Sequence, residues 1–333
     1  MTQQHRILVG DCIEMMRTLP DQSVHTCITS PPYFGLRDYG VDGQIGLEAS
    51  PREFIESLVA VFREVRRVLR DDGTLWVNLG DSYASGGRGG GGRYMAERGD
   101  GAWQGKGDAT GWRSAPAGWK HKDLLGLPWR LAIALQDDGW YLRQDIIWHK
   151  PNPMPESIKD RCTKAHEYLF LLSKSPRYHF DQDAIREPAR AQAAPESASR
   201  RNSFARETKY TDGEHGQTAQ HRTGRDDVDY DETRNKRSVW TVATASFKGA
   251  HFATFPPDLI RPCVLAGSPR GGMVLDPFGG AGTTALVAMQ EGRQSVICEL
   301  NPEYAVLARQ RLDTAWIEGA AQMDFLLDQS PAA

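Results

Sequence analysis

The chain has 333 residues, with 40 Lys and Arg against 43 Asp and Glu and a formal net charge of −3. This length predicts one α/β catalytic domain with a smaller inserted region, and the charge balance excludes a strongly basic protein that packages nucleic acid. No apolar run of about 18 residues occurs, so no membrane-spanning helix is expected, and because the segment 1–5 is polar overall no export signal is expected.

The first informative segment is a turn that follows a predicted strand. The apolar run 24–28 leads into Thr29-Ser30-Pro31-Pro32-Tyr33, and we call residues 30–33 the Pro-Pro turn. The two prolines fix φ and donate no N–H, so the carbonyl groups here are not drawn into a helix. Those carbonyls, the Ser30 hydroxyl and the Tyr33 ring suit a flat heterocycle that bears an NH₂ group. An ordinary Pro-Pro turn after a strand is the alternative.

The next segment predicts a helix and a core strand. A helix is predicted to begin at residues 50–53, Ser50-Pro51-Arg52-Glu53. Ser is at the N-cap, Pro at the first helical position and Glu three residues after the Ser. Apolar residues then recur with helical period, and the helix is expected to stop at Asp72-Gly73, before a strand over 74–79. We assign this apolar stripe to core packing.

Residues 85–120 predict a long irregular insertion, rich in glycine and followed by aromatic and basic residues. Such a segment suits either a lid that contacts DNA or a surface loop. A helix over 124–135 and a hairpin with strands 141–148 and 167–172 follow. Prolines in the connection between these strands forbid regular structure there, and this connection contains Lys150 and Asn152.

The composition changes between residues 186 and 237, where Leu, Ile and Met are absent. A stretch of this kind cannot build its own core. It predicts either a flexible linker or a region whose Arg and Asn side chains contact bases in the major groove. The basic cluster at its end, formed by Arg234, Lys236 and Arg237, is a candidate contact for the DNA backbone.

A β-loop-α-β unit is predicted over residues 273–299. A strand ends at Asp276, residues 277–282 form a glycine-rich loop that we call the glycine loop, a helix begins at Thr283, and a second strand ends at Glu299. Glycines allow a ligand close to the backbone, and an acid at the next strand end can bind ribose hydroxyls. The pattern G-x-G-x-x-A from Gly280 also fits an NAD-type dehydrogenase, so this unit alone leaves two cofactor classes open.

Taken together, the Pro-Pro turn and the glycine loop with its preceding Asp276 resemble the motifs of DNA amino-methyltransferases, which methylate N6 of adenine or N4 of cytosine. A dehydrogenase would leave the Pro-Pro turn without a role. The catalytic motif comes before the cofactor loop, an order similar to the β group of this family. The resemblance implies an α/β, Rossmann-like S-adenosylmethionine-dependent methyltransferase fold with circularly permuted motif order and an inserted target-recognition region.

The resemblance also implies a domain organisation. Residues 1–185 would form the catalytic half with the insertion at 85–120, and residues 238–320 the cofactor-binding half of the same domain. Residues 186–237 would form the polar target-recognition region or linker, and residues 321–333 a tail.

Site residues follow from the same motifs. The residues assigned to catalysis are Ser30, Pro31, Pro32 and Tyr33. Those assigned to S-adenosyl-L-methionine are Asp11, Thr254, Phe255, Asp276, Phe278, Gly280, Gly282, Thr283 and Glu299. Those assigned to double-stranded DNA are Lys150, Asn152, Arg234, Lys236 and Arg237. Among them, Asp11 is expected to face the adenine of the methyl donor, Asp276 its methionine part, and Phe278 the methyl group.

The expected reaction moves a methyl group from S-adenosylmethionine to the exocyclic amine of a base flipped out of the duplex. Within the family, Ser at position 30 leans toward cytosine N4, yet adenine methylation is common overall, so both bases stay open at this point. An RNA base or a protein glutamine amide is an alternative substrate. An NAD-dependent oxidoreductase and a catalytically silent DNA- or cofactor-binding protein are alternatives from other classes.

The sequence also gives expectations about partners and location in the cell. Relatives of this group often pair as homodimers, so a homodimer is one expectation. The five cysteines show no C-x-x-C spacing, which favours reduced thiols in a cytoplasmic protein and gives no metal site. No membrane partner is expected.

Overall fold

The computed structural model describes residues 5–36, 40–84, 96–97, 103–104, 118–189, 233–244 and 255–328, and in 96–97, 103–104 and 318–328 it describes the backbone alone. Most of the insertion at 85–120 and of the polar region at 186–237 lies outside these residues. The chain divides into two compact units, Met1–Ala184 with Arg237–Ala333, and Ile185–Lys236. In the second unit, β8 (Glu187–Pro188) pairs antiparallel with β9 (Thr233–Arg234).

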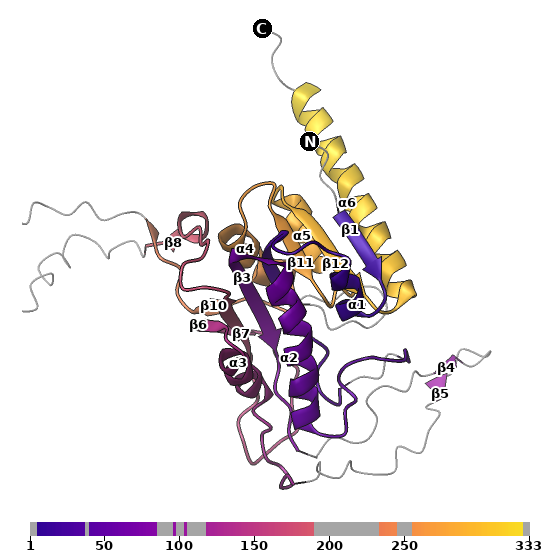
Figure 1. The fold of residues 1–333 in the computed structure, drawn as a ribbon, viewed down its shortest axis with the longest axis vertical. Helices are drawn as coiled ribbons and strands as arrows, with labels where there is room; N and C mark the ends of the chain where they lie inside the picture. The colour runs from indigo at the N-terminus through magenta and orange to yellow at the C-terminus, as the bar shows by residue number, and fades with distance from the viewer. Residues whose placement is uncertain are drawn as a thin grey trace, which may run out of the picture. The chain divides into compact units, whose positions relative to one another are not determined.

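The first unit is built on an eight-stranded sheet with the order β1-β12-β11-β2-β3-β7-β6-β10 (Figure 1). Its parallel part consists of β1 (His5–Val9), β12 (Gln294–Glu299), β11 (Met273–Asp276), β2 (Val24–Thr29) and β3 (Leu69–Leu79). Beyond β3, β7 (His166–Ser173) runs antiparallel to both β3 and β6 (Tyr141–His149), and β10 (Val239–Thr241) runs parallel to β6. The mixed α/β class with a mostly parallel sheet, predicted from the sequence, is confirmed.

Helices cover both faces of this sheet. One layer contains α1 (Cys12–Arg17), α2 (Pro51–Val68) and α3 (Leu127–Asp137), and the other contains α4 (Pro257–Gly267), α5 (Thr283–Gln290) and α6 (Pro302–Asp328). The alternation of side chains along β12 shows the two faces: Val296 and Cys298 pack in the core beneath α1 to α3, whereas Ile297 packs in the cluster with α5 and α6. No helix among the described residues is both long and apolar enough to cross a membrane.

The α2 helix begins where the sequence predicts, but it ends earlier than predicted. Ser50 caps the helix by accepting the Glu53 amide at 3.2 Å, and the Glu53 carboxylate accepts the Ala49 amide at 3.1 Å. The predicted stop at Asp72-Gly73 is wrong, because the helix ends at Val68. Leu69 is fully buried and extended, and it pairs with Val24 of β2, so sheet pairing ends the helix early.

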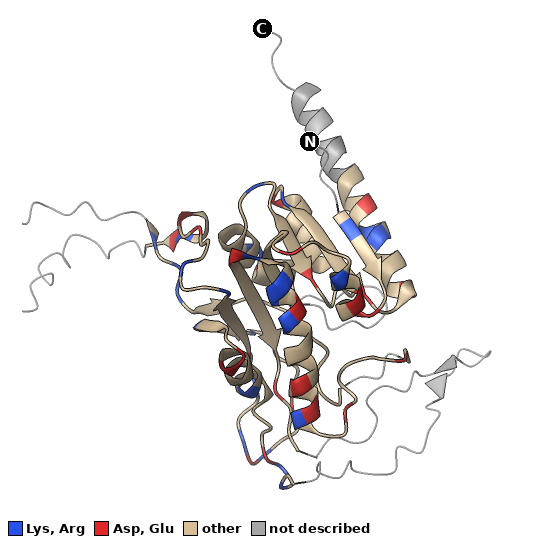
Figure 2. Cartoon of the chain, in the orientation of Figure 1, with Lys and Arg blue, Asp and Glu red and all other residues tan. Residues whose placement is uncertain are grey.

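The outer face of α2 is charged, as Figure 2 shows by its bands of acidic and basic residues. The inner face buries Phe54, Leu58, Phe62 and Val65, which gives the helix its apolar stripe.

The predicted hairpin is confirmed, and α3 begins three residues later than the expected Leu124. Strands β6 and β7 pair antiparallel from Tyr141 opposite Ser173 to His149 opposite His166. Leu124 instead forms a β-bridge with Tyr83. The α6 helix runs on to Asp328, into the segment 321–333 that the sequence sets apart as a tail.

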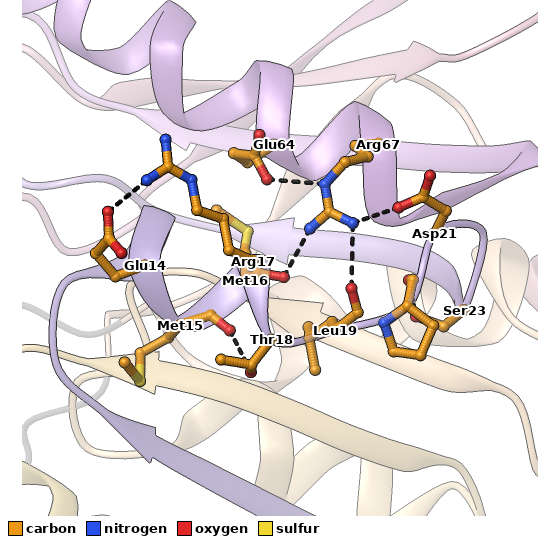
Figure 3. Close-up of polar contacts among 11 residues, drawn as sticks. Glu14, Met15, Met16, Arg17, Thr18, Leu19, Asp21, Ser23, Glu64 and Arg67 are labelled. Atoms are coloured by element: carbon orange, nitrogen blue, oxygen red, sulfur yellow. Dashed lines mark hydrogen bonds and ion pairs between the residues drawn. The ribbon is translucent and has the colours of Figure 1, made fainter.

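Arg67 on α2 fixes the chain that leaves α1 (Figure 3). Its guanidinium donates to the carbonyl oxygens of Met16 at 2.8 Å and Leu19 at 3.1 Å. It also pairs with Glu64 at 2.9 Å and with Asp21. Met16 lies in the last turn of α1 and Leu19 lies just beyond its end, where a cation is favoured.

We predict that Arg67→Met lowers the free energy of unfolding by about 2 kcal/mol, because the Met16 and Leu19 carbonyl groups each lose a charged donor while the apolar stem is kept. Denaturant unfolding followed by circular dichroism measures the change. The matched control is Arg52→Met, which removes only a surface pair with Glu56 and should leave the midpoint unchanged. Equal effects of the two substitutions would contradict this role for Arg67.

Candidate active site

A cavity of about 170 Å³ opens at the carboxyl ends of four parallel strands, β1, β2, β11 and β12. It is lined by eleven of the residues that the sequence motifs assign to catalysis or to the methyl donor: Asp11, Ser30, Pro31, Pro32, Tyr33, Phe255, Asp276, Phe278, Gly280, Thr283 and Glu299. The carboxyl edge of a parallel sheet, at the point where the chain leaves toward opposite sides, is the usual ligand site of α/β folds. Segments from the two ends of the sequence therefore share one cavity.

The Asp276 carboxylate joins these segments. One oxygen, Oδ1, accepts the Thr29 hydroxyl at 2.6 Å and the Phe278 amide at 3.0 Å, and Oδ2 accepts the Thr284 hydroxyl at 2.6 Å. Asp276 is 2% exposed and both threonines are fully buried. Burial raises the pKa of Asp276, and the hydrogen bonds from Thr284, Thr29 and Phe278 oppose that rise. The carboxylate thus ties the strand before the Pro-Pro turn to the glycine loop and to α5.

Glu299 organises the other side of the glycine loop. Its Oε2 accepts the Gly280 amide at 2.7 Å, and its Oε1 accepts the Asn301 amide at 2.8 Å. Burial raises the pKa of Glu299, while these backbone amides lower it. Gly280 has φ of +50°, in the region that favours glycine, so the loop presents bare backbone to the cavity.

Two residues assigned to the methyl donor have other contacts. Asp11 lines the cavity, and its Oδ1 also caps α1 by accepting the amides of Ile13 and Glu14, both at 3.0 Å. Gly282 is not part of the lining. It has φ of +75°, and a Cβ on it would lie 3.0 Å from the Cβ of Ala308, so it lets α5 and α6 approach closely. Thr254 lies outside the described residues.

The Tyr33 ring is held at its tip and on one side. Its hydroxyl donates to Glu167 Oε2 at 2.7 Å, and a Cβ on Gly80 would lie 2.6 Å from the ring carbon Cε2. Burial, and then the charge of Glu167, raises the pKa of Tyr33 well above its usual range. The phenol therefore keeps its proton at neutral pH.

Behind Tyr33 lies a polar network that the sequence motifs did not indicate. Asn78 of β3 donates to the same Glu167 oxygen at 3.3 Å and to the Tyr168 carbonyl at 3.0 Å. Lys150 pairs with the second Glu167 oxygen and lies 4.3 Å from the centre of the Trp148 ring. The sequence signal for these two residues is weak: Asn78 directly follows the apolar run 75–77, and Glu167 directly precedes the apolar run 168–172.

The residues assigned to DNA belong to both units of the chain. Lys150 and Asn152 are outside the cavity lining, and Asn152 accepts the Thr244 amide at 3.0 Å. Within the second unit, Arg234 pairs with Glu187 at 2.9 Å and Lys236 is half-buried, whereas Arg237 of the first unit is exposed. Among the described residues, no group of His, Cys, Asp and Glu is arranged to hold a metal ion.

Comparisons with known proteins agree on one family. Residues 24–310 match the model of a family described as DNA methylase. The chain is 48% identical over 310 residues to the Type II methyltransferase M.Cfr9I of Citrobacter freundii, covering 91% of this chain and 86% of the relative. It is 46% identical over 308 residues to the Type II methyltransferase M.SmaI of Serratia marcescens, covering 92% and 90%.

Solved structures give the same fold. The PvuII DNA methyltransferase (cytosine-N4-specific) is similar with a TM-score of 0.59 and 19% identity, covering 92% of this chain and 86% of that one. A putative DNA modification methylase from Thermus thermophilus, solved in complex with S-adenosyl-L-methionine, has a TM-score of 0.54 and 25% identity, covering 93% and 95%.

We predict that Thr284→Val lowers the free energy of unfolding by about 1–2 kcal/mol, because a buried carboxylate oxygen loses its hydroxyl donor while the side-chain shape is kept. The lost donor favours the ionised carboxyl, whose pKa burial has already raised. The loss should therefore be small at a pH low enough to protonate Asp276, and it should grow as the pH rises through the raised pKa of this carboxyl.

Denaturant unfolding at several pH values measures this loss. Thr314→Val is the matched control, because its hydroxyl contacts only the Gln310 carbonyl on the exposed side of α6. A loss that shrinks as the pH rises would contradict the role given to Asp276.

Proposed function

We propose, from the premise that this chain belongs to the DNA methylase family of N6- and N4-amino-methyltransferases, that its Pro-Pro turn binds the target base and its cavity binds S-adenosylmethionine. Membership follows from the family match over residues 24–310 and from relatives at 48% and 46% identity over nine-tenths of the chain. The chain is therefore an S-adenosylmethionine-dependent DNA methyltransferase that acts on an exocyclic amine, of the Type II restriction-modification kind.

The lining of the cavity fits the methyl donor. Glu299 at the end of β12 is the proposed acceptor for the ribose hydroxyls, and the backbone of Gly280 allows close approach. Phe255 and Phe278 supply apolar surface, with Phe278 assigned to the methyl group. The family resemblance assigns Asp11 to the adenine and the segment around Thr254 to the methionine part. When bound, S-adenosylmethionine supplies an electrophilic methyl group on its sulfonium.

The Pro-Pro turn is proposed to bind the target base. A base must leave the duplex before its amine is accessible, and stacking on Tyr33 offsets part of that cost. The Ser30 hydroxyl and the Pro31 carbonyl are the proposed acceptors for the two amino hydrogens, which turns the nitrogen lone pair toward the methyl group. Positioning then supplies much of the rate. The nitrogen loses its extra proton after it has become cationic, so Ser30 needs no basicity.

We assign cytosine N4 as the target, because the motif begins with Ser30 and the family resemblance links Ser at this position to cytosine. The polar and basic residues Lys150, Asn152, Arg234, Lys236 and Arg237 are proposed to contact the DNA, and residues 186–237 to carry target recognition. A homodimer in the cytoplasm is the assembly that the resemblance implies, and sedimentation of the purified protein tests it.

The product identifies the reaction. Purified protein incubated with unmethylated genomic DNA and S-adenosylmethionine should yield N4-methylcytosine, measured by mass spectrometry of the digested nucleosides. N6-methyladenine instead would overturn the assignment of the base but not of the reaction. Absence of both products, with binding of the methyl donor shown separately, would point to an RNA base or a protein amide.

Substitutions should separate the two halves of the site. Tyr33→Ala and Pro31→Ala should each lower turnover at least about 100-fold with unchanged affinity for S-adenosylmethionine, because stacking and amine positioning are lost. Glu299→Gln should instead weaken that affinity about tenfold, because one charged acceptor is lost. Calorimetric titration and a radiolabelled methyl-transfer assay measure both quantities. Equal loss of donor affinity in all three variants would contradict the assigned roles.

A further inference from the structure

We propose that Glu167 is a positioning residue for the Tyr33 ring, and that it fixes the ring and the Lys150 side chain through its two carboxylate oxygens. This inference rests on the proposed function, in which Tyr33 is the surface on which the flipped base stacks. Glu167 lies at the start of β7, outside every motif that the family resemblance covers.

Glu167 holds the tip of the Tyr33 ring. Tyr33 donates its hydroxyl to Glu167 Oε2 at 2.7 Å, and Asn78 donates to that oxygen at 3.3 Å. A hydrogen bond from a hydroxyl to an ionised carboxylate is about twice as strong as a neutral one. The Glu167 side chain is 13% exposed, so little water competes for this oxygen.

Gly80 packs against one side of the Tyr33 ring. The ring lies against Gly80 at the end of β3, where a Cβ would come within 2.6 Å of Cε2 and 3.2 Å of Cδ2 and Cζ. Rotation of the ring about χ1 would break this contact and the bond to Glu167 together. The Tyr33 pKa, raised by burial and by Glu167, keeps the phenol a donor. The ring is thus ordered before DNA binds, which lowers the entropic cost of stacking.

The second oxygen of Glu167 has a partner of its own. It holds the ammonium of Lys150, which also lies over the Trp148 ring at 4.3 Å from its centre. Lys150 is 18% exposed, and a buried cation without a partner is costly. One carboxylate therefore sets the position of both the stacking ring and the adjacent cation.

An ion pair at this position is weak evidence of a stabilising role. Glu167 shares its face of β7 with Leu169 and Leu171, which are buried and apolar. A buried ion pair is often no more stabilising than apolar residues of similar volume. A charge placed here is better explained by the orientation it gives to Tyr33.

The test is a double-mutant cycle of Tyr33→Phe and Glu167→Gln. The readouts are the single-turnover rate of methyl transfer with both substrates saturating, and the fluorescence of 2-aminopurine placed at the target base. Glu167→Gln alone should lower the rate about tenfold and reduce the flipped-base signal, because the ring loses its anchor. In the Tyr33→Phe background it should change the rate less than about twofold, because the bond to the ring is already gone and saturating DNA offsets any loss at Lys150.

Controls separate this inference from folding and from the proposed function. Glu56→Gln removes an exposed carboxylate on α2 and should match the wild type. If thermal melting shows Glu167→Gln to be unfolded, the same cycle is run in a Lys150→Met background, where no unpaired cation is left.

Losses that multiply in the double variant would overturn the inference, since Glu167 would then act independently of the ring. The Tyr33→Ala variant distinguishes failure of the proposed function from failure of the role given to Glu167. Full turnover in Tyr33→Ala would refute the proposed function, whereas a dead Tyr33→Ala with multiplying losses would refute only the role of Glu167.

Discussion

The Asp276 carboxylate binds β2, the strand before the Pro-Pro turn, and the glycine loop to each other. It takes one hydroxyl from Thr29 of β2 and another from Thr284 of α5, residues far apart in sequence, and an amide from Phe278 between them. Because β2 and β11 are adjacent and parallel, this carboxylate lies between the Pro-Pro turn and the glycine loop. These bonds add to the pairing of β2 and β11, and together they fix the Pro-Pro turn relative to the glycine loop.

The sheet order explains how a site can be made from distant parts of the chain. The Pro-Pro turn follows β2, near the start of the sequence, and the glycine loop follows β11, near its end. The two strands are neighbours in the sheet, and the chain leaves them toward opposite sides, which opens a crevice at the carboxyl edge. A methyl donor in the cavity and a base on Tyr33 would meet there. The separation along the sequence is thus irrelevant to the chemistry.

Local sequence patterns predicted the structural features that depend only on neighbouring residues. The Ser50 cap, the hairpin of β6 and β7, and the glycine loop that follows a buried strand are of this kind, because capping, alternation and turn chemistry act over a few residues. The end of α2 was not predictable in this way, since Leu69 is recruited by a strand from another part of the chain. Glu167 and Asn78 were missed for the same reason: sheet register brings them to Tyr33, and no spacing in the sequence encodes that meeting.

A crystal structure of the enzyme with its DNA and an unreactive analogue of S-adenosylmethionine tests the central claim most directly. The account predicts a flipped base stacked on Tyr33, with its exocyclic nitrogen about 3–3.5 Å from the position of the methyl group. It also predicts that the bonds from Thr29 and Thr284 to Asp276 are kept. A base bound away from the Pro-Pro turn, or an Asp276 released from both threonines, would contradict it.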